Sequence, residues 1–171
     1  RRITNNYDLM SGSLLGDDFS NDDVKLLLTK YKADFKTIEH DKLNVIIAKK
    51  IAEGNVVGWM QGCMEFGPRA LGNRSILADP RNADSQMKVN LKIKYRESFR
   101  PFAPSILEED VDNYFNLNGF SPYMLLVKNV DKSKLLLLPD SYKDMLMNEK
   151  YYIKKSLVPS ITHVNNSTRI K

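Results

Sequence analysis

A turn-rich, positively charged stretch between residues 65 and 104 constrains this chain more than any other segment. Gly67, Pro68 and Gly72 interrupt it, because glycine permits positive φ and proline lacks an amide hydrogen. From Arg69 to Arg100 it carries eight basic and three acidic residues. The whole chain has a net charge of +5, so the rest of the sequence is neutral overall. The excess positive charge is therefore local, which favours a site for an anion.

The composition fits one folded domain, and we expect it to cover residues 1–171 as a piece of a longer protein. Apolar residues make up 42% and charged residues 27%, which excludes a disordered chain. The longest aliphatic run is 135–138, far short of the roughly 20 residues of a membrane span. No signal peptide is visible, so we expect a cytoplasmic protein. The lone Cys63 excludes an internal disulfide and a cysteine-rich zinc site.

Apolar periodicity predicts an α/β or α+β fold. The expected helices cover residues 20–31, 41–54 and 108–115, and the expected strands cover 56–60, 122–127 and 157–164. We expect the strand at 56–60 to be buried and residues 165–169 to form a polar turn. Residues 131–155 mix leucines, a proline and charges, which predicts an insertion or loop with one short helix. In residues 87–95 apolar and polar side chains alternate, which by itself favours a strand.

The glycine-rich turn after residue 62 is suited to an anion. Successive amides in such a turn form a concave donor surface, and the guanidinium groups of Arg69 and Arg74 match phosphate or carboxylate oxygens. Glu65 could orient Arg74 through a salt bridge or lie near Mg²⁺, and the structural role is favoured. A surface turn with solvated arginines is the alternative.

Three segments together resemble one family. They read MEFGPRALGNRSILADPR at 64–81, KYRESFRPFAPS at 94–105 and PSITHV at 159–164. The chain is similar in these segments to the C-terminal domain of the nodulation-type (NodU/CmcH) O-carbamoyltransferases. The resemblance implies a YrdC-like fold, with a twisted mixed β-sheet flanked by helices, here truncated. It also implies that Asp84 to Tyr95 is a helix, against the period-two pattern.

The resemblance further implies an enzyme that uses ATP, Mg²⁺ and carbamoyl phosphate to form carbamoyl-adenylate. Phosphate or carbamate oxygens would be bound by three catalytic residues, Lys94, Arg96 and Arg100. The cofactor-binding residues would be Arg69, Gly72, Arg74, Ser75, Thr162, His163 and Arg169. For His163 a structural, hydrogen-bonded role is an equally open alternative. No metal ligand is expected in this chain.

The family's partner is an N-terminal domain of actin-like ATPase fold, with a metal site, which this sequence does not contain. We expect small-molecule substrates, no membrane, and leave an oligomer open. The alternatives are an RNA-binding YrdC-like module and an inactive scaffold. Basic residues that are not interleaved with exposed aromatics argue against RNA. Two departures from the family are Cys63, where an arginine is usual, and Asn165-Asn166, where Asp-Gly is usual.

Overall fold

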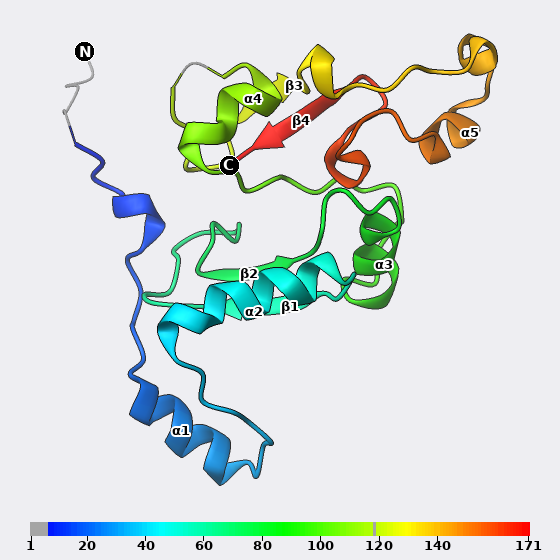
Figure 1. Ribbon diagram of the computed structural model, residues 1–171. Coiled ribbons are helices and arrows are strands. Elements are labelled where there is room, and N and C mark those ends of the chain that lie inside the picture. The colour runs from blue at the N-terminus through cyan, green and yellow to red at the C-terminus, as the bar shows by residue number, and fades with distance from the viewer. Residues whose placement is uncertain (1–6, 118) are drawn as a thin grey trace. The chain divides into compact units, whose positions relative to one another are not determined.

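The structure is a computed structural model that describes residues 7–117 and 119–171. Within these ranges the elements are five α-helices, five short 3-10 turns and four short strands (Figure 1). They form two compact units, residues 7–53 with 57–77 and residues 54–56 with 78–171. The α+β class is confirmed. The strands expected to share one mixed sheet lie in two separate antiparallel pairs, and the single domain over 1–171 stays a prediction.

The helices of the first unit begin and end close to the predicted positions. Helix α1 spans Asn21–Lys30 and is capped by Ser20, whose Oγ accepts a hydrogen bond from the Asp23 amide at 3.1 Å. The Asp23 carboxylate in turn accepts from the Ser20 amide, which completes a capping box. Helix α2 spans His40–Ala52, just before Gly54, which has φ +85°. Neither helix has a buried residue.

A β-hairpin completes the first unit. Strand β1, Val57–Met60, pairs antiparallel with β2, Arg74–Leu77, so that Val57 lies opposite Leu77. Helix α2 contacts β1 (Figure 1). The strand expected at 56–60 is confirmed by β1, but its expected burial was wrong, because half-buried and exposed residues alternate along it. Strand β2 was not predicted, since its four residues follow directly on the glycine-rich turn.

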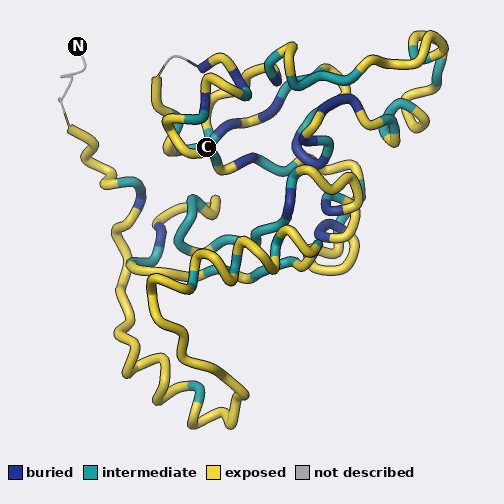
Figure 2. The backbone as a smooth tube through the Cα atoms, viewed as in Figure 1, coloured by how far each residue is buried: buried dark blue, intermediate teal, exposed yellow. Residues whose placement is uncertain are grey.

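The second unit contains the hydrophobic core. Figure 2 shows buried positions along strand β4, Ser167–Ile170, and in the short helix α4, Val111–Phe115. Strand β3, Leu126–Asn129, pairs antiparallel with β4, Ser167–Ile170. The core residues are Val111, Phe115, Leu117, Val130, Val158, Ile161 and Ile170. The helix expected from residue 108 is confirmed, with a 3-10 turn over Glu108–Asp110 ahead of α4.

Helix α3 spans Ser85–Lys92, so the helix expected over residues 84–95 is confirmed and the strand pattern was misleading. Its buried positions are Ser85, Val89 and Asn90, at helical spacing. Met87 and Leu91 are each at least 40% exposed. The alternation therefore did not mark a buried face.

The C-terminal expectations were partly wrong. The predicted strand at 157–164 contains a 3-10 turn, Pro159–Ile161, because proline lacks the amide that a strand ladder needs. The strand instead lies at β4, within the segment expected to be a polar turn. Residues 131–155 contain one short α-helix, α5, Met147–Tyr152, among turns, as expected. In the described part of the chain, no helix is long and apolar enough to cross a membrane.

Candidate functional site

A buried carboxylate organises the glycine-rich turn of the first unit. The Glu65 side chain is 1% exposed, and its Oε1 accepts hydrogen bonds from the amides of Leu71 at 2.8 Å and Asn73 at 2.9 Å. The Gly72 amide donates to Ser75 Oγ at 3.2 Å. The amides expected to receive an external anion are therefore already engaged. The anion in this concave surface is Glu65 itself, which supports its structural role.

The arginines of this turn differ in their contacts. Arg74 donates to the main-chain oxygen of Gly67, and its Nε lies 3.5 Å from Glu65 Oε2. Gly67 and Gly72 have φ of +116° and +121°, which side chains rarely adopt, so both glycines are needed for this path. Arg69 is exposed. Arg74 thus fastens the turn, while the side chain of Arg69 lies at the surface.

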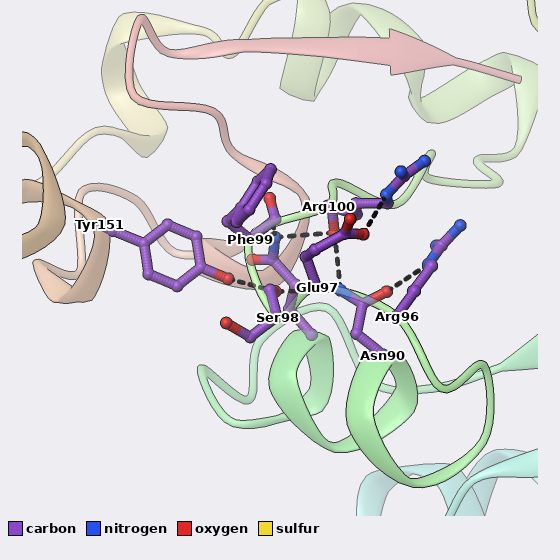
Figure 3. Close-up of polar contacts among 8 residues, drawn as sticks. Asn90, Arg96, Glu97, Ser98, Phe99, Arg100 and Tyr151 are labelled. Carbon is purple, nitrogen blue, oxygen red and sulfur yellow. Dashed lines mark hydrogen bonds and ion pairs between the residues drawn. The ribbon is translucent and has the colours of Figure 1, made fainter.

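A buried side-chain amide organises the segment that follows α3 in the second unit, residues 94–101, which we call the basic loop. Asn90 is fully buried, and its Nδ2 donates to the main-chain oxygens of Ser98 at 3.0 Å and Arg100 at 2.8 Å. Its Oδ1 accepts from Arg96 Nε at 2.6 Å. The peptide amide of Arg96 also donates to the Asn90 carbonyl, at 3.0 Å. One side chain therefore sets both the path of the loop and the direction of Arg96 (Figure 3).

Two further side chains hold the same loop. Gln86 Nε2 donates to the main-chain oxygens of Phe99 at 3.2 Å and Arg100 at 3.0 Å. The Tyr151 hydroxyl, from α5, donates to the main-chain oxygen of Ser98. Gln86 and Asn90 lie four residues apart on α3, so both reach the loop from one helix face. Three donor side chains thus satisfy three consecutive carbonyls.

The loop presents its predicted catalytic residues at the surface. Arg96 lies 5.0 Å from the Phe102 ring centroid, a cation–π contact that fixes its outer part. Arg100 Nε pairs with Glu97 at 2.7 Å, and this hydrogen bond lowers the pKa of Glu97 and raises that of Arg100. Lys94 is exposed. Figure 3 shows Arg96 and Arg100 extending away from Tyr151, so the loop has a basic face and an opposite face.

A cavity of about 670 Å³ lies against Ser98, Phe99 and Pro101 of this loop. Its wall also includes the start of α3, helix α5 and residues 159–164. Thr162 and His163 line it, whereas Lys94, Arg96 and Arg100 do not. Lys94, Arg96 and Arg100 therefore lie on the loop outside the cavity. Arg169, the remaining predicted site residue of the second unit, does not line the cavity either.

Backbone and hydroxyl contacts hold Thr162 and His163 in the cavity wall. Thr162 Oγ1 donates to the Val158 oxygen at 2.8 Å and lies 2.7 Å from Ser156 Oγ. Burial lowers the pKa of His163, and the positive charges of Lys155 and Arg169 lower it further. Arg169 is exposed on β4. Each of these effects favours the neutral form of the His163 imidazole.

The turn after His163 explains one departure from the expected family pattern. Asn165 Oδ1 accepts from the amide of Ser167 at 3.2 Å and from its hydroxyl at 2.7 Å, as an aspartate could. Asn166 has φ +62°, a conformation that glycine and asparagine tolerate best. Asn165-Asn166 therefore preserves the turn that Asp-Gly would make.

The sequence matches the family described as carbamoyltransferase C-terminus over residues 48–171. The chain belongs to this family. It is 48% identical, over 99% of its length, to an uncharacterized protein of Synechocystis sp.. Nodulation protein NolO of Bradyrhizobium diazoefficiens is 44% identical over 70% of the chain, and 3'-hydroxymethylcephem-O-carbamoyltransferase of Amycolatopsis lactamdurans is 35% identical over 80%. The matched regions span 28%, 22% and 21% of these relatives, respectively.

Within this carbamoyltransferase C-terminal domain, sequence reasoning missed the residues that hold the loop. Asn90 and Gln86 were overlooked because the alternating pattern of 87–95 hid their shared helix face. Tyr151 and Lys155 lie in the segment expected to be an insertion or loop, which carried no signal of a site. Among residues 7–117 and 119–171 there is no cluster of three His, Cys, Asp or Glu side chains suited to a metal ion. That the glycine-rich turn and the basic loop meet at one nucleotide stays a prediction.

Proposed function

We propose that this chain forms carbamoyl-adenylate from ATP and carbamoyl phosphate, as part of an enzyme that carbamoylates a hydroxyl of a small molecule or sugar. Family membership supports carbamoyl transfer, and the 35% identical cephem enzyme is named as an O-carbamoyltransferase. The observation that carries the proposal is the basic loop. Its two arginines extend to one side, and buried Asn90 fixes the guanidinium of Arg96.

The reaction suits these residues because its transition state concentrates negative charge on phosphate oxygens. Water first splits carbamoyl phosphate into carbamate and inorganic phosphate. A carbamate oxygen then attacks the α-phosphorus of ATP, and the bond to the leaving pyrophosphate breaks with its electron pair on pyrophosphate. Arg96, Arg100 and Lys94 would bind the phosphate and carbamate oxygens, and their fixed charges would stabilise the transition state. No acid or base is required in this step. The binding roles of Arg69, Gly72, Arg74, Ser75, Thr162, His163 and Arg169 are part of the same proposal. For Gly72 and Ser75 it requires that the ligand replace the hydrogen bond between the Gly72 amide and Ser75 Oγ.

Mg²⁺ would supply further charge neutralisation on the phosphates. The described residues offer basic donors suited to a phosphate chain and no three-residue metal cluster. Mg²⁺ commonly keeps several waters and binds through substrate phosphates with one or two carboxylates. ATP would therefore bring the ion, and this chain would bind the phosphates.

The acceptor and the transfer step belong to a further part of the protein in this proposal. The chain matches about a fifth of NolO and of the cephem enzyme, so both relatives have long additional regions. We propose an N-terminal partner domain of actin-like ATPase fold that receives carbamoyl-adenylate and transfers the carbamoyl group. This division would place the acceptor-selecting surface outside residues 7–171.

Pyrophosphate exchange tests this function. The complete polypeptide that contains this chain should exchange labelled pyrophosphate into ATP when carbamoyl phosphate is present, and not without it. Lys94→Ala and Arg96→Ala should each lower the exchange rate about a hundredfold, because they remove charge from the transition state. Lys143→Ala removes an exposed lysine far along the chain and should leave the rate unchanged. Absent exchange in the folded wild-type protein would favour an inactive scaffold.

One observation favours a second function, the binding of single-stranded RNA. We expected no exposed aromatics among the basic residues, and this was wrong: Tyr95 is 85% exposed and Phe99 is 63% exposed, between Lys94 and Arg100. Bases stack on exposed rings while basic side chains contact the phosphates. Affinity for an RNA oligonucleotide should then fall steeply with salt and weaken in Tyr95→Ala. An affinity that does not change with salt would exclude this function.

A further inference from the structure

The cavity of the second unit contains a buried lysine with no acidic partner. Lys155 is 5% exposed and lines the cavity. Its Nζ donates to the main-chain oxygen of His163, the single acceptor that the described residues supply. No carboxylate of the described residues lies within 4 Å of it. A lysine held this way is costly to bury, because its charge is neither solvated nor paired.

The rest of the cavity wall combines apolar surface with a few polar groups. Phe99 and Pro101 come from the basic loop, Met87 from α3, and Tyr151 and Tyr152 from α5. A cavity of about 670 Å³ is large enough for a drug-sized organic molecule. Mostly apolar walls with one buried ammonium group, that of Lys155, suit a ligand that carries a flat or apolar body and one acidic group.

We propose that this cavity binds a small phosphate-bearing organic molecule, and that the Lys155 ammonium pairs with its phosphate group. The burial and the contacts of Lys155 support an anion-binding site independently of the proposed function. The choice of a phosphate compound rests on the proposed function, which supplies two sources of that group, a nucleotide and carbamoyl phosphate. Tyr151, which lines the cavity, lies on the side of the loop opposite to Arg96 and Arg100 (Figure 3).

The charges around Lys155 favour an incoming anion. Burial lowers the pKa of Lys155 to about 8. The positive charge of Arg169 also acts electrostatically on His163, which lines the same cavity. The other ionisable groups that line the cavity are Asp84, Tyr151, Tyr152, Lys154 and His163. Burial lowers the pKa of His163 and raises the pKa of Tyr151, so both shifts move these groups away from the range in which Lys155 titrates. A bound phosphate would hold Lys155 in its charged form.

Isothermal titration calorimetry of the 171-residue chain with AMP, carbamoyl phosphate and inorganic phosphate tests the site. We expect at least one organic phosphate to bind more tightly than inorganic phosphate, because the apolar wall contacts its body. Lys155→Met should weaken that binding about ten- to a hundredfold, the usual cost of losing a charged hydrogen bond. Lys143→Met, with the same charge change at an exposed position, should bind as wild type does.

A second variant separates the charge of Lys155 from its structural contact. Wild-type affinity should fall more than tenfold from pH 7 to pH 9.5, as an amine with a pKa of about 8 loses its proton. Lys155→Arg keeps a cation that does not titrate in this range, so its affinity should be nearly constant. Circular dichroism verifies the fold of each variant.

The outcomes distinguish this site from the proposed reaction. Tighter binding of AMP assigns the cavity to the nucleotide, and tighter binding of carbamoyl phosphate assigns it to the co-substrate. Equal wild-type affinity at pH 7 and 9.5, or unchanged affinity in folded Lys155→Met, would overturn the proposal even if pyrophosphate exchange proceeds. Lysine-dependent binding without exchange would support the site and contradict the reaction.

Discussion

The glycine-rich turn and the basic loop each satisfy main-chain polar groups with a buried side chain, but the turn uses an acceptor and the loop uses a donor. In the turn, the Glu65 carboxylate accepts hydrogen bonds from two peptide amides. In the loop, the Asn90 amide donates to two peptide carbonyls and also accepts from Arg96. Each basic segment is therefore shaped by one buried polar side chain.

The difference between the two segments concerns what each leaves for a ligand. Glu65 brings its own negative charge, which offsets the charge of Arg74 and uses the amides of the turn. Asn90 is neutral, so Arg96 keeps its full positive charge while its direction is fixed. A neutral organiser preserves the positive field of the segment, whereas a charged organiser reduces it. The basic loop thus offers the stronger positive field of the two for the proposed anion site.

Substitution of Asn90 should have the largest effect on stability. Asn90→Asp keeps the acceptor for Arg96 but removes the two donors to Ser98 and Arg100, so the free energy of unfolding should fall by about 2–4 kcal/mol. Urea denaturation followed by circular dichroism measures this. Asn44→Asp is an exposed control on α2 and should change stability little. Equal losses in the two variants would contradict the organising role of Asn90.

Substitutions of Glu65 should distinguish the contribution of its hydrogen bonds to stability from the contribution of its charge. Glu65→Gln keeps an oxygen that accepts from Leu71 and Asn73, and should cost about 1 kcal/mol. Glu65→Ala leaves both buried amides unsatisfied, and should cost about 2–3 kcal/mol. Hydrogen exchange of these two amides reports the change directly. If the glutamine variant were as unstable as the alanine variant, charge rather than hydrogen bonding would hold the turn.

Lys155 should make the stability of the chain depend on pH in an unusual direction. Its pKa is near 8 in the folded chain and near 10.5 when unfolded, so the unfolded state binds more protons between these values. Stability should therefore rise with pH, by about 1–2 kcal/mol from pH 7.5 to 9.5. The same denaturation series on Lys155→Met should lack this rise. An identical pH dependence in both proteins would show that Lys155 is not the cause.

The smallest effect on stability is expected at the exposed ion pair of the loop. Glu97 and Arg100 are both about half exposed, and solvent screens their attraction. Arg100→Ala should leave thermal unfolding unchanged while lowering pyrophosphate exchange, whereas Glu97→Gln should leave thermal unfolding unchanged and keep the exchange. A clear stability loss in Arg100→Ala would show that the loop depends on this pair and not on Asn90 alone.

Local sequence signals predicted several elements well. Ser20 and the acids that follow it predicted the start of α1, and Gly54 predicted the end of α2, because caps and left-handed positions are set by neighbouring residues. The motif resemblance predicted the family and the helix at 84–95. The strand at 157–164 was wrong because Pro159 cannot join a ladder, and the apolar residues around it instead fill the core through a turn.

The sequence by itself determined the concentration of positive charge, the α+β class and the family, because these depend on composition, periodicity and motifs that neighbouring residues carry. Only the tertiary structure revealed that Glu65 fills the amide surface of its own turn, that Asn90 directs Arg96, and that Lys155 is buried beside a cavity. These features join residues six to ten positions apart or more, and their chemistry depends on burial. The sequence does not show whether a glutamate, an asparagine or a lysine is buried or exposed, because that depends on the fold.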